Sequence, residues 1–130
     1  MKRLVLLALL VFSGCVEEFP EADLPRVYIA SHHGDTATLS LRSDHTYTHT
    51  IRRGDGQILT SEGAWKSILH QKQTYIEFPD FQVVPYYGLL NPNRVRNRSW
   101  TIAIERTYLR SIEICFDDDV GYCYIQQSNS

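Results

Sequence analysis

The chain has 130 residues, of which 13 are basic and 15 are acidic, and its formal net charge is −2 at pH 7. This length suits one domain, and the weakly acidic balance argues against a nucleic-acid partner, which would need a basic surface. Eight Tyr and five Phe favour strands over helices.

The first 14 residues have the pattern of a secretory signal peptide. Lys2 and Arg3 precede nine uncharged apolar residues, Leu4 to Phe12, and small residues follow. A bilayer-spanning helix needs roughly 20 apolar residues, so this run is too short to cross a membrane. We expect residues 1–14 to be removed. The remaining 116 residues would then carry 11 basic and 15 acidic side chains, a balance of −4.

The segment Phe12-Ser13-Gly14-Cys15 resembles the bacterial lipobox, in which the cysteine is lipidated and becomes the first mature residue. The resemblance implies a lipid on Cys15 that anchors the protein in the cell envelope. Val16 follows the cysteine in place of Asp, which implies sorting to the outer membrane, facing the periplasm. The alternative is an ordinary signal peptide cut near Cys15 without lipid.

The rest of the chain divides into three predicted parts. Residues 15–25 begin with the lipidated cysteine, and the acidic residues and prolines that follow it predict a tether. A single β-domain over residues 26–127 and a polar tail over residues 128–130 complete the prediction.

Short strands separated by turns are predicted along the whole domain. Alternation is clearest over residues 45–52, where Tyr47, His49 and Ile51 share one face of a half-buried strand. Gly54-Asp55-Gly56 is a strong turn signal. The predicted strands cover residues 27–30, 36–42, 45–52, 58–62, 63–68, 74–78, 99–106, 109–116 and 122–126.

Residues Phe81 to Leu90 are apolar but carry Pro85 and Gly88, which predicts a loop or irregular edge. The apolar side chains of this region are predicted to complete the core. The alternative is a contact surface or the lining of a barrel mouth. Its apolar members are Phe78, Phe81, Val83, Val84, Tyr86, Tyr87, Leu89 and Leu90.

Eight or nine short strands joined by tight turns predict an all-β fold. Short connections favour an antiparallel meander, and such a sheet protects its edges by closing into a small barrel or a sandwich.

The run Leu39-x-Leu41-x-x-Asp44-His45-Thr46-Tyr47, followed by Gly63-Ala64-Trp65 and Ile76-x-Phe78, resembles the lipocalin-like pattern of many small uncharacterised bacterial lipoproteins. The match covers roughly residues 36–78, and His45 stands where the pattern usually has Gly. The resemblance implies a small barrel, which could carry a small apolar ligand.

Two cysteines remain once Cys15 is assigned to lipid. Cys115 and Cys123 flank an Asp-rich turn in a predicted hairpin, and we expect a cross-strand disulfide in an oxidising compartment. A bulge at Gly121 could shift the register. Free thiols or a metal site are the alternatives.

Neither histidines nor acidic residues form a recognisable metal motif. His45 and His49 fall on one strand face but about 13 Å apart, too far for one ion. We expect loop and surface histidines and no metal. Asp117, Asp118 and Asp119 do not match the spacing of an EF-hand, and a solvated hairpin tip is the preferred interpretation.

Arg94, Arg96 and Arg98 recur at every second residue. In an extended segment they would form a ridge on one face, suited to anionic headgroups, glycan phosphate or an acidic partner. The alternative is a solvated face.

No catalytic motif is present: there is no Gly-x-Ser-x-Gly elbow, no phosphate-binding Gly loop and no His-Glu-x-x-His pair. We expect no catalytic residue and no cofactor. The prediction is a noncatalytic, membrane-anchored binding or interaction lipoprotein that holds an envelope protein, for example an inhibitor or immunity protein. The alternative is a lipocalin-like carrier of an apolar small molecule, and an envelope enzyme is a more distant third.

Overall fold

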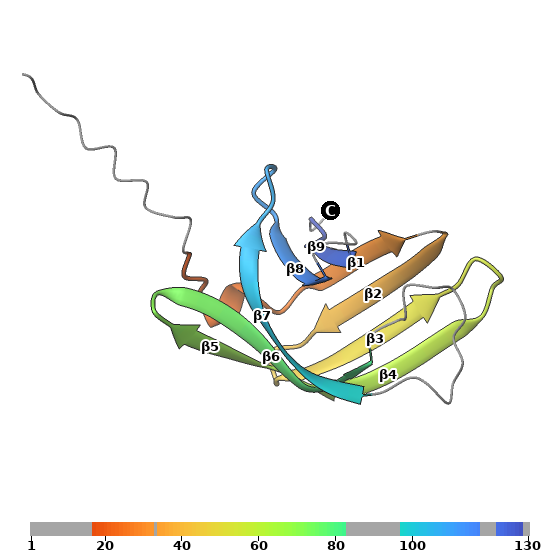
Figure 1. Cartoon of the computed structure of the whole chain (residues 1–130), viewed down its shortest axis with the longest axis horizontal. Helices are drawn as coiled ribbons and strands as arrows, with labels where there is room; N and C mark the ends of the chain where they lie inside the picture. The colour runs from red at the N-terminus through yellow and green to blue at the C-terminus, as the bar shows by residue number, and fades with distance from the viewer. Residues whose placement is uncertain (1–16, 33, 83–96, 118–121, 129–130) are drawn as a thin grey trace, which may run out of the picture.

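A computed structural model describes residues 17–32, 34–82, 97–117 and 122–128 of the chain. Nine antiparallel strands account for most of them, with one short 3-10 helix, η1 (Glu21–Asp23), ahead of the first strand (Figure 1). The strands are β1 (Val27–His32), β2 (Asp35–Leu41), β3 (Thr46–Arg52), β4 (Ile58–Ala64), β5 (Lys66–His70), β6 (Gln73–Gln82), β7 (Asn97–Arg106), β8 (Ile112–Asp117) and β9 (Tyr122–Gln126).

The strands form one sheet in the order β4-β3-β2-β1-β9-β8-β7-β6-β5. The two strands at its ends, β4 and β5, are consecutive in the chain and separated only by Trp65. β4 pairs with β3, and β5 pairs with β6, so the stretch changes partner at Trp65 and brings the sheet edges together. The result is a nearly closed barrel, which confirms the predicted all-β meander.

Trp65 is fixed at this change of partner by three hydrogen bonds. Its backbone N donates to His45 O at 2.9 Å, and its indole Nε1 donates to the carbonyls of Arg42 and Thr46 at 3.0 and 3.1 Å. These partners belong to the turn between β2 and β3 and to the first residue of β3. The buried indole therefore joins that turn to the bend between β4 and β5.

The barrel interior is filled by large side chains. The alternation predicted for β3 is confirmed, because Tyr47, His49 and Ile51 are all buried. Phe78 and Phe81 of β6 are also buried, as expected for a stretch that completes the core. Their apolar neighbours in the sequence, residues 83–90, lie outside the described residues. The remaining fully buried large side chains are Tyr28, Trp65, Tyr124, Leu24, Leu39, Ile76, Ile104 and Ile114.

The segment before β1 differs from the predicted tether. Phe19 and Leu24 are buried in the core, and the Tyr28 hydroxyl donates a hydrogen bond to Leu24 O at 2.7 Å. Phe19 N donates to Thr74 Oγ1 at 2.8 Å, and Thr74 N donates to Glu17 O at 3.2 Å. The packed domain therefore begins no later than Glu17 and not near Arg26, because two apolar side chains of this acidic segment fill one end of the barrel.

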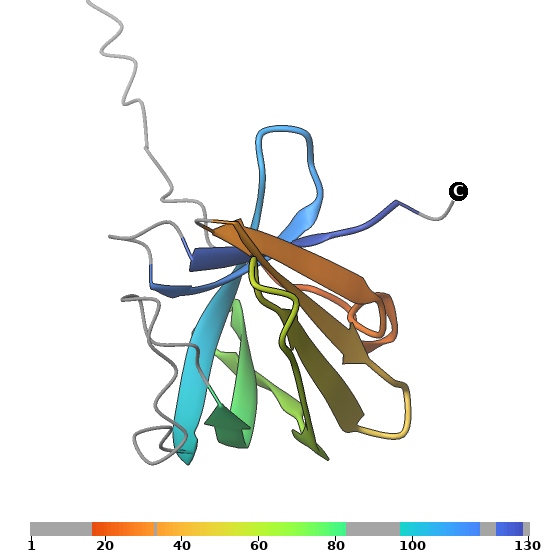
Figure 2. The same ribbon diagram turned by 90° about the vertical axis from the view of Figure 1, so that its right-hand side faces the viewer.

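The antiparallel strands give the barrel two distinct ends. The N-terminal end carries the segment Glu17–Leu24 together with the turns after β2, β5 and β7. The opposite end carries the turn after β3 and the ends of β1, β6 and β8. Figure 2 shows that the hairpin joining β7 and β8 projects well beyond the rest of the barrel.

Two strand boundaries differ from the prediction for local reasons. β6 continues through Pro79 and Asp80 to Gln82, and its pairing with β7 shifts register between Phe78 and Phe81. Proline lacks the N–H of a regular ladder and is tolerated at such an irregularity. Leu109, predicted within a strand, lies in the turn between β7 and β8, since β8 begins at Ile112.

Candidate functional site

A histidine and a tyrosine form the only polar pair of side chains that the described residues place deep in the barrel. His49 of β3 and Tyr124 of β9 are fully buried, and His49 Nε2 lies 2.7 Å from the Tyr124 hydroxyl. The two residues are 75 positions apart, so only the closed sheet brings them together. The prediction of surface histidines is wrong for His49, whose position on the apolar face of β3 places it inside.

Aromatic rings surround this pair. The His49 ring stacks on Phe81 with centroids 4.6 Å apart, and Phe81 stacks on Phe116 at 4.5 Å. Phe116 also meets Tyr124 edge-on at 5.4 Å. Burial lowers the pKa of His49 from 6.5 to about 4, so the imidazole is neutral at pH 7.

The chemistry open to His49 is limited by its contacts. Among the described residues, His49 Nδ1 is buried without a hydrogen-bond partner. Such an atom costs free energy unless water or another group satisfies it. In the described part of the chain His49 contacts Tyr124 and Phe81, and neither residue supplies the carboxylate that would orient a catalytic base.

His45 lies outside the barrel, away from His49. His45 sits on the exposed turn between β2 and β3 with a φ of 66°, the left-handed conformation that Gly adopts easily. His45 Nε2 contacts the Glu21 carboxylate, and its ring lies 5.1 Å from that of Trp65. This contact is the main cause of the lowered pKa of Glu21. The structure does not bring His45 and His49 together as metal ligands.

The cysteine pair lies on the hairpin of β8 and β9. Cys115 and Cys123 are direct cross-strand neighbours joined by a disulfide, with Cα atoms 4.0 Å apart. The register shifts just after this pair, between Cys115 and Asp117. The predicted bulge position, Gly121, lies outside the described residues.

Glu113 joins the cysteines in the one cluster of potential metal ligands found among the described residues. Its Oε1 lies 2.7 Å from Cys115 Sγ, and one ligand atom from each of Glu113, Cys115 and Cys123 lies within 4.8 Å of the others. The sulfurs are bonded to each other, so they offer no thiolate to a metal in this state.

The predicted arginine ridge cannot be traced as a surface. Arg94 and Arg96 lie outside the described residues, and only the backbone of Arg98 is described, near the start of β7 at the opposite end of the barrel. Asp118 and Asp119 also lie outside them, as do Cys15 and residues 1–14.

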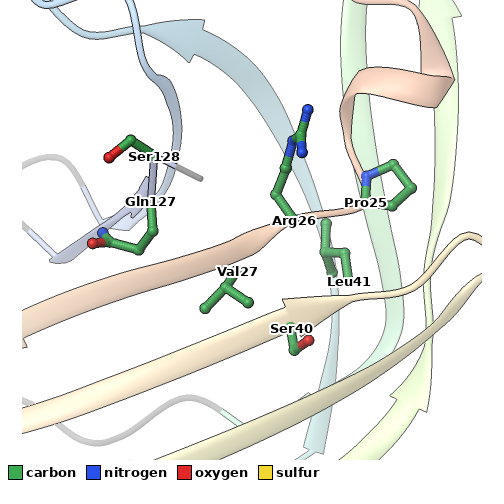
Figure 3. A pocket seen from close by; sticks show the side chains of 7 residues that line it. All are labelled: Pro25, Arg26, Val27, Ser40, Leu41, Gln127 and Ser128. Carbon is green, nitrogen blue, oxygen red and sulfur yellow. The ribbon is translucent and has the colours of Figure 1, made fainter. Parts of the chain in front are cut away.

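Among the hollows lined entirely by described residues are the following three. The largest, of about 520 Å³, lies at the start of β1 beside the C-terminal residues, and Arg26 is its one charged lining residue (Figure 3). A hollow of about 240 Å³ lies where β7 and β8 stop pairing, near the disulfide. The third, of about 310 Å³, lies between residues 18–20 and β5. None of them converges nucleophile, base and acid groups.

In the part of the chain that the structure describes, no helix has the length and apolar character needed to span a membrane. Comparisons of the chain with protein-family models, with curated proteins and with solved structures gave no significant match.

Proposed function

We propose that this protein is a noncatalytic binding lipoprotein of the bacterial envelope, anchored through Cys15 and presenting the opposite end of its barrel to a partner protein. The observation that carries the proposal is the packing of residues Glu17–Leu24 on one end of the barrel. A lipid on Cys15 would lie two residues before this packed segment. The N-terminal end of the barrel would therefore face the membrane that holds the lipid.

The aromatic interior favours a binding module over a carrier. Rings of Tyr47, Phe78, Phe81, Phe116 and Tyr124 contact one another with centroid distances between 4.5 and 5.7 Å. A carrier needs a cavity that can hold its ligand, typically 300 Å³ or more. Two of the hollows lined by described residues contain none of these rings, and the smallest, of about 240 Å³, borders the cluster only at Phe116.

The opposite end offers polar groups that suit recognition. In the turn after β3, Gly54 N donates a hydrogen bond to Asp35 Oδ1 at 3.0 Å, which fixes this turn against the start of β2. Arg98 lies near the start of β7 at the same end, and Arg94 and Arg96, which precede it in the sequence, complete the predicted ridge. An acidic surface of an envelope hydrolase would suit such a ridge, which is the inhibitor or immunity version of the proposal.

The test places a photo-crosslinking amino acid at one exposed turn on each end, in the anchored protein in its own host. Gln57 probes the opposite end, and Ser43 is the matched control on the N-terminal end. We expect a specific envelope protein to be captured from Gln57 and not from Ser43. Mass spectrometry of the mature N-terminus checks the lipid on Cys15 in the same preparation.

Each part of the proposal has its own contradicting result. A mature N-terminus without lipid refutes the anchor, and capture from neither position refutes the binding role. Partner binding that an Arg94→Ala, Arg96→Ala, Arg98→Ala triple variant leaves unchanged refutes the role of the ridge. An apolar molecule that stays with the domain in native mass spectrometry would favour the carrier instead.

A further inference from the structure

Two large apolar residues stand fully in solvent at the tip of the β7–β8 hairpin. Tyr108 is 100% exposed and Leu109 is 84% exposed. The tip is held in shape by Thr107 N donating to Ser111 O at 2.8 Å and Arg110 N donating to Thr107 O at 2.8 Å. A projecting, ordered tip that presents adjacent apolar side chains indicates a contact with an apolar environment.

The chain that leads to Cys15 arrives beside this tip. Arg106, the last residue of β7, binds the Glu17 carboxylate through its Nε at 2.5 Å. The Arg106 guanidinium also lies 4.7 Å from the centre of the Phe19 ring. Cys15 is two residues before Glu17 in the sequence, and two residues span at most about 7 Å. A lipid on Cys15 would therefore enter its membrane close to the β7–β8 tip.

A second hairpin tip lies on the same end of the barrel. β5 and β6 turn at Gln71 and Lys72, and Leu69, just before the turn, is 61% exposed. β6 is tied to the same segment, because Thr74 N donates to Glu17 O. In Figure 1 the described segment that begins at Glu17, drawn in red, lies between the two hairpins.

We propose that these two tips form a membrane-contacting rim, made of Leu69, Lys72, Tyr108, Leu109 and Arg110, that seats the N-terminal end of the barrel on the bilayer surface. This inference rests on the lipid anchor of the proposed function. Tyr108 and Leu109 enter the interfacial layer, where Tyr is favoured because its ring is apolar and its hydroxyl stays hydrated.

The cationic side chains of the rim suit a lipid surface, and one acidic side chain, Glu18, is exposed near Leu69. Lys72 and Arg110 are exposed at the two tips, where their cationic groups can reach headgroup phosphates. Two nearby carboxylates are engaged within the protein, because Glu17 binds Arg106 and Glu21 contacts His45. The seated barrel would stand with the opposite end directed away from the membrane.

The experiment uses the anchored mature protein in vesicles of phosphatidylethanolamine and phosphatidylglycerol whose acyl chains carry bromine, which quenches nearby tryptophan. A Tyr108→Trp variant probes the rim. The matched control is Ile58→Trp, since Ile58 is 53% exposed at the start of β4 on the opposite end. The unsubstituted protein gives the background of Trp65 and Trp100.

We expect the added tryptophan of Tyr108→Trp to lose most of its emission on brominated lipid and that of Ile58→Trp to lose almost none. Lipid present on Cys15 with Tyr108→Trp unquenched overturns the rim but leaves the anchor intact. Equal quenching of both variants also overturns it, because the barrel would then lie on its side. Absence of lipid on Cys15, read by mass spectrometry, overturns the anchor and the rim with it.

Discussion

Adding one methyl group at Gly63 should destabilise the barrel because a tyrosine ring lies directly over this glycine. A Cβ at Gly63 would lie 2.6 Å from Tyr47 Oη and 2.7 Å from the ring atoms Cε1 and Cζ. Tyr47 cannot easily move away. Its ring is buried against Phe78 and Phe81, and its hydroxyl donates a hydrogen bond to Asp80 O at 2.5 Å.

The magnitude follows from two opposing effects of Gly63→Ala. Replacing Gly with Ala in a strand ordinarily stabilises by up to about 1 kcal/mol, because the unfolded chain loses conformational freedom. Overpacking against a buried side chain such as Tyr47 costs about 1–3 kcal/mol. The net expectation is a loss of about 1–2 kcal/mol in the free energy of unfolding, or a melting temperature lower by roughly 4–8 °C in a domain of this size.

Urea unfolding followed by tryptophan fluorescence measures this loss, with Gly54→Ala as the matched control. A Cβ at Gly54 would meet the Gly34 carbonyl at ordinary contact distances, 3.4 Å from its O and 3.8 Å from its C, so that variant should change stability by less than about 0.5 kcal/mol. In a Tyr47→Leu background the ring is gone, and Gly63→Ala should then cost almost nothing. An equal cost of Gly63→Ala in both backgrounds would refute the steric explanation.

Three further predictions concern the interior, the N-terminal segment and the disulfide. The pKa of His49 is about 4 in the folded state and about 6.5 in the unfolded chain, so stability should fall as pH drops from about 7 to about 4. The loss should be about 3 kcal/mol in urea titrations, and it should be absent in His49→Gln. Phe19→Ala should lower the free energy of unfolding by about 3 kcal/mol, because the side chain is buried, whereas the exposed control Glu18→Ala should lower it by less than about 0.5 kcal/mol. Equally small losses in both variants would mean that the segment is a tether. Reduction of the Cys115–Cys123 disulfide, which spans eight positions, should cost about 2–3 kcal/mol in thermal unfolding, and unchanged melting would contradict this estimate.

Strands with one buried face could be predicted from sequence because their signal is local. Alternation identified β3 with its inward Tyr47, His49 and Ile51, and the last strand was predicted with its observed bounds, Tyr122–Gln126. The break predicted at Gly63 falls two residues later, at Trp65. Gly63 does not interrupt the strand, because its missing side chain leaves room for the Tyr47 ring. No local sequence pattern shows that a ring from a neighbouring strand lies over this glycine.

The candidate site depended on contacts between distant parts of the chain, which a single sequence does not reveal. His49 could have been placed inside from its position on the apolar face, but its partner Tyr124 is 75 residues away. Phe19 and Leu24 stand alone among acidic residues and prolines, so composition indicated a tether. Their burial depends on the open barrel end that they fill. The exposed Tyr108 and Leu109 were missed because strand-forming residues in a turn look like the start of the next strand.

The short sequence separation between Cys15 and Phe19 determines how the anchored barrel would be oriented on the membrane. Four residues span at most about 14 Å, and Phe19 is buried with its backbone N donating a hydrogen bond to Thr74 Oγ1. A lipid on Cys15 would therefore hold the barrel against the membrane, whereas the predicted flexible tether would let it turn freely. A protein held in this way presents one end to every partner, and its binding residues need to lie there. The probe at Tyr108 tests whether the N-terminal end contacts the membrane, and the probe at Gln57 tests whether the opposite end contacts a partner. If both ends of the anchored barrel were equally exposed, there would be no reason to place the partner site opposite the anchor.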